Sequence, residues 1–400
     1  MFASLAIFLI SLGGVGGSFQ PTRLLILIAG LFSGIRKRVK KNVLGMTPLI
    51  RKGLIIYIIW ILYGLLTLFW APDPLLGLNS EIIVMGIGMS SLLFFPYYYE
   101  NKIFTVNTLC QLWAWSCIAT LPIAIYEIFT FQHFFYEDEE RVLGGLGLNV
   151  PFAATFFGNY NGYSTILCFY YPFLLISFMN EKRKLYKIIF GTAIFLSIII
   201  VMINTSRGAL ITFAIITLFA MKVNIKRIAI SFSSLIILYF MLPSGIKNTI
   251  DTVFKYRFGG GGGLKDDSRS GLLNAGIDFL INSYGFGIGA GGFEIEMEKS
   301  KYYSGMVNPH NIFIEILSQY GLIIFILFVY WLFLLCLSIW KNKILTKDIR
   351  KILIGTILCF PIIGAINSAA LGYTYWWVFL TTLAMIASIK PKLNINDKSF

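Results

Sequence analysis

The chain has 400 residues, of which 57% are hydrophobic and only 13% are charged, and its mean hydropathy is +0.77. Soluble domains carry roughly 25% charged residues, so this composition excludes an ordinary soluble enzyme, a disordered chain and a secreted disulfide scaffold. The net charge of +14 does not require a nucleic-acid partner, because membrane proteins concentrate Lys and Arg in their cytoplasmic loops.

Apolar runs recur from one end of the chain to the other, and they predict an all-α, polytopic membrane bundle of about twelve transmembrane helices. One membrane domain is expected over residues 1–400, with a large outer loop at 244–308 that contains short helices and joins the ninth and tenth spans. The expected spans are about 2–17, 20–35, 53–71, 82–98, 104–129, 153–179, 188–203, 209–221, 228–243, 309–336, 352–371 and 376–389.

The loops predict the orientation. If the N-terminus is cytoplasmic, the even-numbered connections are cytoplasmic too, and they hold most of the Lys and Arg, for example at 36–52, 182–187 and 341–351. This asymmetry predicts a multi-pass protein with both termini in the cytoplasm. The five cysteines lie in apolar stretches without a C-x-x-C pair, so we expect buried thiols rather than disulfides or metal ligands.

Two polar features precede the long outer loop. The acidic run Glu137–Glu140 is typical of a solvated loop. The short connection Asn204–Gly208 contains Arg207, a charge at the outer membrane boundary. Arg207 either faces a polar cavity and has a function there, or extends its head group to the interface at little cost.

The long outer loop contains Arg257, the five-glycine run Gly259–Gly263 and then Asp267-Ser268-Arg269. Asp267 or Ser268 can cap a helix that starts at Arg269. Apolar residues at helical spacing follow, and they predict a helix face that lies on the membrane or on the bundle.

Glycines recur again at 285–292, where Gly287, Gly289 and Gly292 match the spacing G-x-G-x-x-G. A dinucleotide site would need a strand before this motif and a helix after it in a cytosolic unit, and the sequence predicts neither. Two interpretations remain: close approach of main-chain N–H groups to a phosphate or sugar, or a plain turn.

The sequence Asn308-Pro309-His310-Asn311 precedes the tenth span. Asn308 and Pro309 suit a helix start, which predicts His310 in the first helical turn. The positive end of a helix favours neutral imidazole, which can accept a proton as a general base does. The alternative is an interfacial His that makes one hydrogen bond. His133 lies in an aromatic stretch without polar neighbours in sequence, and no function is expected for it.

These outward Arg residues, the His and the glycine segment indicate an anionic substrate at the outer leaflet. Guanidinium groups bind phosphate oxygens through two parallel hydrogen bonds, and a diphosphate-linked lipid that carries sugar fits this chemistry. The sequence has no suitably placed metal motif, so Arg is expected to stabilise the departing diphosphate, and no metal or cofactor is expected.

The same residues resemble the family of O-antigen ligases and Wzy-type polysaccharide polymerases. The resemblance lies in Ser206-Arg207-Gly208, in the stretch from Arg257 through Asp267-Ser268-Arg269 to Phe293, and in His310-Asn311 with Glu315 and Tyr320-Gly321. Asn159-Tyr160-Asn161-Gly162 resembles the family's Asn-Pro-Asn-Gly step with Tyr160 in place of Pro, and Gln319 stands where an acidic residue is common.

The resemblance implies a metal-independent glycosyltransferase of the bacterial cell membrane with its active site on the outer face. It would transfer a glycan from an undecaprenyl-diphosphate-linked oligosaccharide to a hydroxyl of an acceptor glycan. His310, Arg269 and Arg207 would be catalytic, and the substrate-binding residues would be Arg257, Asn311, Gly287, Gly289, Asn161 and Glu315. A flippase and a chain-length regulator are candidate partners, and membrane lipid surrounds the chain.

Three functions remain open. A polymerase uses another lipid-linked repeat unit of a surface polysaccharide as acceptor, whereas a ligase uses lipid A core or another envelope molecule. The third is a lipid-linked oligosaccharide transporter or flippase without chemistry, which would be expected to show mid-span ionisable residues and inverted repeats. The sequence indicates neither of these transporter features. The motifs are shared by polymerases and ligases, and of these two we favour the polymerase.

Overall fold

The computed structural model describes residues 2–15, 19–37, 47–100, 104–134, 142–143, 148–149, 151–221, 247, 251, 267–368 and 370–389. Across these ranges the chain is helical, apart from a two-residue antiparallel pairing of β1 (Val142–Leu143) with β2 (Leu148–Asn149). The helical elements are α1 (Phe2–Phe8), η1 (Leu9–Leu12), α2 (Pro21–Lys37), α3 (Pro48–Thr67), α4 (Pro74–Leu76), the π-helical turn η3 (Gly77–Ile82), α5 (Ile83–Glu100), α6 (Val106–Thr130), α7 (Tyr160–Asn180), α8 (Lys184–Ile203), α9 (Arg207–Ala220), α12 (Asp267–Asn282), α13 (Gly292–Glu298), α14 (Ile312–Lys341), α15 (Lys347–Leu358), α16 (Phe360–Ile363), η4 (Ala370–Gly372) and α17 (Thr374–Ala387).

Apolar helices of membrane-spanning length confirm the expected fold class. In the described part of the chain, six helices can cross a membrane by length and composition: Pro48–Thr67, Pro74–Pro96, Val106–Thr130, Tyr160–Asn180, Lys184–Ile203 and Ile312–Lys341. Shorter apolar helices accompany them at Phe2–Leu12, Pro21–Phe32, Arg207–Ala220 and Thr374–Ala387. The chain is therefore a multi-pass helical membrane protein, while the count of twelve spans stays a prediction. The expected ninth span at 228–243 and the acidic run at 137–140 lie outside the described residues.

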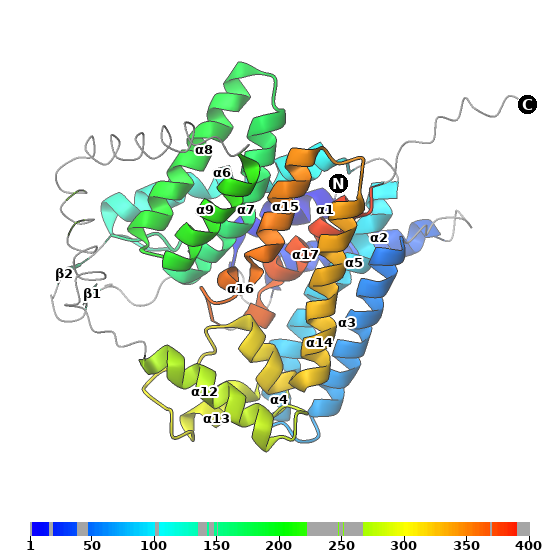
Figure 1. The fold of residues 1–400 in the computed structure, drawn as a ribbon, viewed down its shortest axis with the longest axis vertical. Coiled ribbons are helices and arrows are strands. Elements are labelled where there is room, and N and C mark those ends of the chain that lie inside the picture. Colours follow the sequence, from blue (N-terminus) through cyan, green and yellow to red (C-terminus); the bar gives the residue numbers. More distant parts are fainter. Residues whose placement is uncertain are drawn as a thin grey trace, which may run out of the picture.

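One end of the bundle carries α12 and α13, and we call it the α12 end (Figure 1). The last turn of α3 reaches this end, where Thr67 accepts a hydrogen bond from the backbone N–H of Ala290 at 3.1 Å. The end of α8 and the start of α7 also meet, since Asn204 donates to the carbonyl of Tyr160 at 3.3 Å. Because the end of α8 lies beside the start of α7, these two successive helices run in opposite directions.

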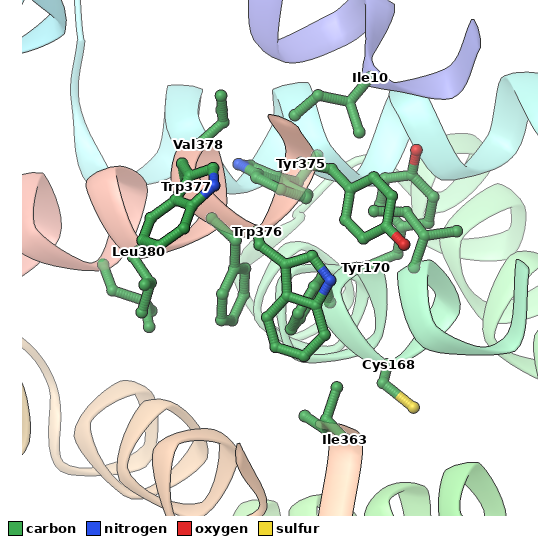
Figure 2. Close-up of a cluster of buried hydrophobic side chains, with 14 of the residues drawn as sticks. Ile10, Cys168, Tyr170, Ile363, Tyr375, Trp376, Trp377, Val378 and Leu380 are labelled. Carbon is green, nitrogen blue, oxygen red and sulfur yellow. The ribbon is translucent and has the colours of Figure 1, made fainter. Parts of the chain in front are cut away.

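The centre of the bundle is α7, and nearly all of its side chains from Gly162 to Ser177 are buried. Figure 2 shows the aromatic packing around it, with Trp376 of α17 on the side of Tyr170 and Trp377 on the side away from it. Trp376 meets Phe169 of α7 edge to face, with ring centroids 4.8 Å apart. Such pairs stabilise a core through both burial and ring geometry.

Apolar side chains also cover the outside of the bundle. Ile58 and Leu62 of α3 are 56% and 61% exposed, and Phe333 of α14 is 60% exposed. On a water-soluble protein such a surface would promote aggregation, whereas in a bilayer it faces lipid tails. The five cysteines are free thiols, four of them buried and Cys336 partly buried, which confirms the expectation of buried thiols.

Two expected helix boundaries differ from the structure. The tenth span begins at Ile312 rather than 309 and extends to Lys341, with a non-helical residue inside it at Gly321. The eleventh ends earlier than expected, because α15 stops at Leu358 and only the short α16 follows. The break after Leu358 could not be predicted, because the sequence stays apolar beyond it.

Candidate functional site

The helices α12 and α13 lie together at the α12 end and form a small core of their own (Figure 1). Its buried side chains are Leu272, Ala275 and Phe279 of α12 with Phe293 and Met297 of α13. Ile314 of α14 packs against this core. The helical apolar face expected after Arg269 therefore lies on the protein, and this contact fixes α12 beside the start of α14.

The glycine segment at 285–292 packs closely against the bundle. The N–H of Gly287 donates to Ser283 Oγ at 2.9 Å, and the N–H of Gly289 donates to the carbonyl of Gln319 at 3.1 Å. Both glycines have positive φ, +85° and +98°, and a Cβ at Gly289 would lie 2.7 Å from Ala71. Their backbone thus approaches protein, and it holds the α12–α13 unit against α14 and the end of α3.

A cavity of about 290 Å³ lies between α12 and the start of α14. Arg269 and Ser270 of the first turns of α12 line it, together with His310 and Asn311 before α14 and Ala365 after α16. Arg269 is exposed and His310 is partly buried. The structure therefore brings together three of the residues that the sequence singled out, from segments about forty residues apart.

His310 is held neutral in this cavity. Burial, and secondly the positive charge of Arg269, lower the pKa of His310 to about 4. Its Nδ1 is buried and has no hydrogen-bond partner among the residues that the structure describes. A neutral imidazole with a free ring nitrogen next to a cation can accept a proton from a bound hydroxyl.

The position of His310 relative to the helix differs from the expectation. Asn311, not Asn308, is the N-cap of α14, and its side chain accepts a hydrogen bond from the N–H of Phe313 at 2.9 Å. His310 consequently lies just before the helix rather than in its first turn. The hydrogen bond from the N–H of Ile312 to the carbonyl of Gly364 at 2.9 Å fixes this later start.

Arg207 is the first residue of α9 and is exposed. It lies outside the wall of the Arg269 cavity, although the adjacent Gly208 packs against Ile366, the neighbour of the cavity residue Ala365. Arg207 is thus placed at the same end of the bundle by its own helix.

Of two other residues expected to bind substrate, the structure describes only one. Asn161, partly exposed, lies in the first turn of α7 behind the cap residue Asn159. Arg257 lies outside the described residues.

Glu315 lies in a second cavity of about 140 Å³. Pro309 lines both cavities. Glu315 is 3% exposed and accepts a hydrogen bond from the N–H of Ala370 at 2.9 Å. His310 and Glu315 therefore line different cavities.

Sequence reasoning missed the surroundings of two buried glutamates. Glu81, placed before the fourth span by the sequence, is 8% exposed and lines the second cavity. Glu127 is fully buried, and its Oε2 accepts hydrogen bonds from the N–H groups of Ala154 and Thr155 at 2.8 and 2.7 Å. An acidic residue at the edge of an apolar run was the only sequence signal for either.

The polar partner of His133 was also missed. His133 stacks on Phe152 with ring centroids 3.9 Å apart, and its Nδ1 is 3.8 Å from Glu127 Oε2. Burial lowers the pKa of His133, while the Glu127 carboxylate opposes that shift. The expectation of an apolar setting without polar neighbours was therefore wrong, because the partner comes from the preceding span.

The described ranges contain no group of three or more His, Cys, Asp or Glu side chains that could hold a metal ion. The charged groups available to a substrate in the larger cavity are those of Arg269 and, when protonated, His310. The arrangement can bind an anion at Arg269 and accept a proton at His310.

Comparison with known proteins agrees with this chemistry. A family model described as O-antigen ligase matches residues 192–329. This part of the chain is therefore similar to the O-antigen ligase family. The matched residues include Arg207, Arg269, His310 and Glu315. Of the polar residues that line the two cavities, Ser80 and Glu81 lie outside the match.

A curated relative extends the similarity beyond residues 192–329. The teichuronic acid biosynthesis protein TuaE of Bacillus subtilis (strain 168) is 25% identical over 394 residues, which cover 92% of this chain and 78% of that protein. Together the two comparisons support the family of O-antigen ligases and polysaccharide polymerases.

Proposed function

We propose that the protein is a glycosyltransferase that polymerises lipid-linked repeat units of a surface polysaccharide at the outer face of the bacterial cell membrane. The donor is an undecaprenyl-diphosphate-linked oligosaccharide, and the acceptor is a sugar hydroxyl of another such unit. The similarity to the O-antigen ligase family supports glycan transfer, and the name of the relative, a teichuronic acid biosynthesis protein, supports a role in polysaccharide synthesis.

The observation that carries the proposal is that Arg269 and His310 line one cavity. His310 accepts the proton of the acceptor hydroxyl, whose oxygen attacks the anomeric carbon of the donor sugar. The bond from that carbon to the diphosphate oxygen breaks, and its electron pair leaves with undecaprenyl diphosphate. Arg269 stabilises the negative charge on this leaving group through paired N–H donors.

The remaining expected residues have supporting roles in the proposal. Arg207, exposed at the start of α9, and Arg257 also bind the diphosphate. Asn311 and Asn161 orient sugar hydroxyls.

The glycines act through backbone geometry. Gly287 and Gly289 keep the α12–α13 unit, and with it Arg269, at the cavity. Their N–H groups are already bonded within the protein, so their contribution is to position the substrate-binding helices.

The finer features follow from the same chemistry. Guanidinium groups supply the positive charge that a metal ion supplies elsewhere, so transfer is metal-independent and uses no cofactor. The α12 end faces outward and both termini are cytoplasmic, since Lys and Arg such as Arg51, Lys184 and Lys347 begin helices at the opposite end. A flippase that delivers the donor and a chain-length regulator are its functional partners.

One experiment separates this function from its alternatives. Purified full-length protein is incubated with a single lipid-linked repeat unit and no added acceptor. A ladder of longer lipid-linked products supports the polymerase. Reaction only after a lipid A core or another envelope molecule is added supports the ligase, with which the family model is equally consistent. No product with either acceptor contradicts glycosyl transfer and leaves transport of the lipid-linked unit.

A further inference from the structure

The second cavity shares the lining residue Pro309 with the Arg269 cavity. Its polar wall comes from three parts of the chain: η3, the α13 unit and the first turns of α14. The residues that matter are Ser80, Glu81, Glu294, Pro309, Glu315 and Gln319. A site built from segments so far apart in sequence, next to the proposed base, has no role in the mechanism above.

Two buried carboxylates are rigidly held in this wall. Glu81 Oε1 accepts a hydrogen bond from Tyr320 Oη at 2.6 Å, and its Oε2 accepts one from the N–H of Gly291 at 2.9 Å. Glu81 belongs to the π-helical turn η3, a local departure from regular helix that is common at functional sites. Glu315 is fixed from the other side by the N–H of Ala370.

Gln319 also indicates that a ligand binds in this cavity, independently of the two glutamates. Its side chain is 2% exposed, it lines the cavity, and its Oε1 has no hydrogen-bond donor in the described part of the molecule. A buried amide oxygen without a donor is unfavourable unless a bound molecule supplies the missing hydrogen bond. The cavity therefore favours a ligand that brings O–H or N–H groups.

The charges narrow the chemistry of that ligand. Glu294, an exposed carboxylate of this wall, repels phosphate and uronate groups, and the carboxyl oxygens of the wall accept hydrogen bonds from hydroxyls. The described residues contain no group of three or more His, Cys, Asp or Glu side chains that could hold a metal ion, so the wall does not favour a divalent cation. A neutral sugar provides several hydroxyl donors at once and needs no compensating charge.

We propose that this cavity binds a neutral sugar of the acceptor glycan, through hydroxyl donors to Glu81, Glu294 and Gln319. The proposal rests on the glycosyl transfer argued above, because it treats Pro309 as the residue shared by a donor cavity at Arg269 and an acceptor cavity at Gln319. His310 and Glu315 then flank the place where the two substrates meet. The enzyme consequently selects neutral over acidic sugars at the acceptor end.

The first test measures binding without turnover. Methyl N-acetylglucosaminide and methyl glucuronide are used as probes in saturation-transfer NMR with the purified full-length protein. The neutral probe should bind at least about tenfold better, because the carboxylate of the glucuronide is repelled by the acidic wall of the cavity. Equal binding of the two probes, or no binding of the neutral one, overturns the proposal.

Charge removal at the cavity has a matched control on the same helix. Glu294 lines the cavity, whereas Glu298 lies one turn later on α13 and is exposed outside its wall. Glu294→Gln should reduce the preference for the neutral probe severalfold and Glu298→Gln should leave it unchanged. The same shift in both variants indicates a general surface-charge effect and refutes a specific site.

Turnover separates this inference from the proposed function. Gln319→Met keeps the side-chain size and removes the amide oxygen, so it should raise the KM for acceptor by about tenfold and leave the KM for the lipid-linked donor unchanged. Transfer with an unchanged acceptor KM refutes the acceptor cavity while the function stands. Sugar binding that depends on Glu294 without any transfer by the wild type refutes the function while the cavity stands.

Discussion

Arg269 and His310 face one cavity, and the positive charge of the guanidinium helps to keep the imidazole neutral. This relationship couples the two substrates. When the diphosphate of the donor pairs with Arg269, the repulsion that lowers the pKa of His310 is compensated. We infer that His310 becomes a stronger base once the donor is bound, which restricts proton removal from the acceptor to the complete complex.

Arg269→Lys tests the diphosphate contact. A lysine keeps the charge but cannot make two parallel hydrogen bonds to phosphate oxygens, so transfer should fall about 10- to 100-fold, as expected for one lost charge-assisted bond. The measurement is polymer formed per amount of membrane protein. Arg51→Lys, the same change at an exposed site on the first turn of α3, is the control. Normal polymer with Arg269→Lys would remove this role from Arg269.

The pH dependence of transfer tests the state of His310. Because a general base works in its neutral form, which dominates above its pKa, activity should be lost as the pH falls through about 4, the value set by burial and Arg269. In Arg269→Gln the charge is gone but burial remains, so the pKa of His310 rises and the acid limb moves to higher pH. The limb is read from kcat/KM, which reports the free enzyme. An acid limb at the same pH in both proteins contradicts the coupling.

His310→Ala should block transfer and preserve donor binding. Loss of a general base lowers the rate about 10²- to 10⁴-fold, whereas the diphosphate still binds Arg269. Turnover and binding of labelled donor are measured on the same preparation. His133→Gln serves as the control, since His133 contacts Phe152 and Glu127 instead of the cavity, and it should retain transfer. Unchanged turnover in His310→Ala excludes His310 as the base.

Chelation tests the absence of a metal requirement. If guanidinium groups neutralise the leaving diphosphate, purified protein in EDTA should transfer glycan at the rate measured before chelation. The assay follows product formation after EDTA and again after excess Mg²⁺ is restored. Complete inhibition that Mg²⁺ reverses would show that a metal ion takes the part assigned to arginine.

The sequence predicted the helical membrane fold because lipid forces a simple pattern on it. Every span must be long, apolar and internally hydrogen-bonded, so helices such as α3 and α8 are visible as apolar runs. Arg269 and His310 were also recognisable, because charged and titratable residues are few near these runs. Helix starts were less certain, and α14 shows why: Asn308 and Asn311 are equally good caps until the backbone contact with Gly364 is known.

The second cavity could not be predicted, because its residues meet only in the folded chain. Glu81 is held by Tyr320 and Gly291, more than 200 residues away in sequence. The same applies to Glu127. Its backbone donors, Ala154 and Thr155, lie in another segment of the chain, 27 and 28 residues further on. Such pairings depend on how helices pack, which hydropathy does not encode.

Gly321→Ala tests whether the break in α14 supports the site. Gly321 has φ +74° and ψ −175° inside the helix, and an added Cβ would lie 2.6 Å from the carbonyl carbon of Phe286 in the glycine segment. The substitution should cost about 1–3 kcal/mol through backbone strain and push that segment away from α14. A lower thermal midpoint and reduced transfer are therefore expected in purified protein.

The control for this prediction is Gly86→Ala on α5. There the added Cβ would make only an ordinary contact with Ile61 at 3.5 Å, and the backbone is helical. Replacing a helical glycine by alanine should leave the midpoint unchanged or raise it, by up to about 1 kcal/mol. Equal midpoints and equal transfer in the two variants would mean that α14 accommodates a side chain at Gly321, and that the glycine segment does not depend on this break for its position.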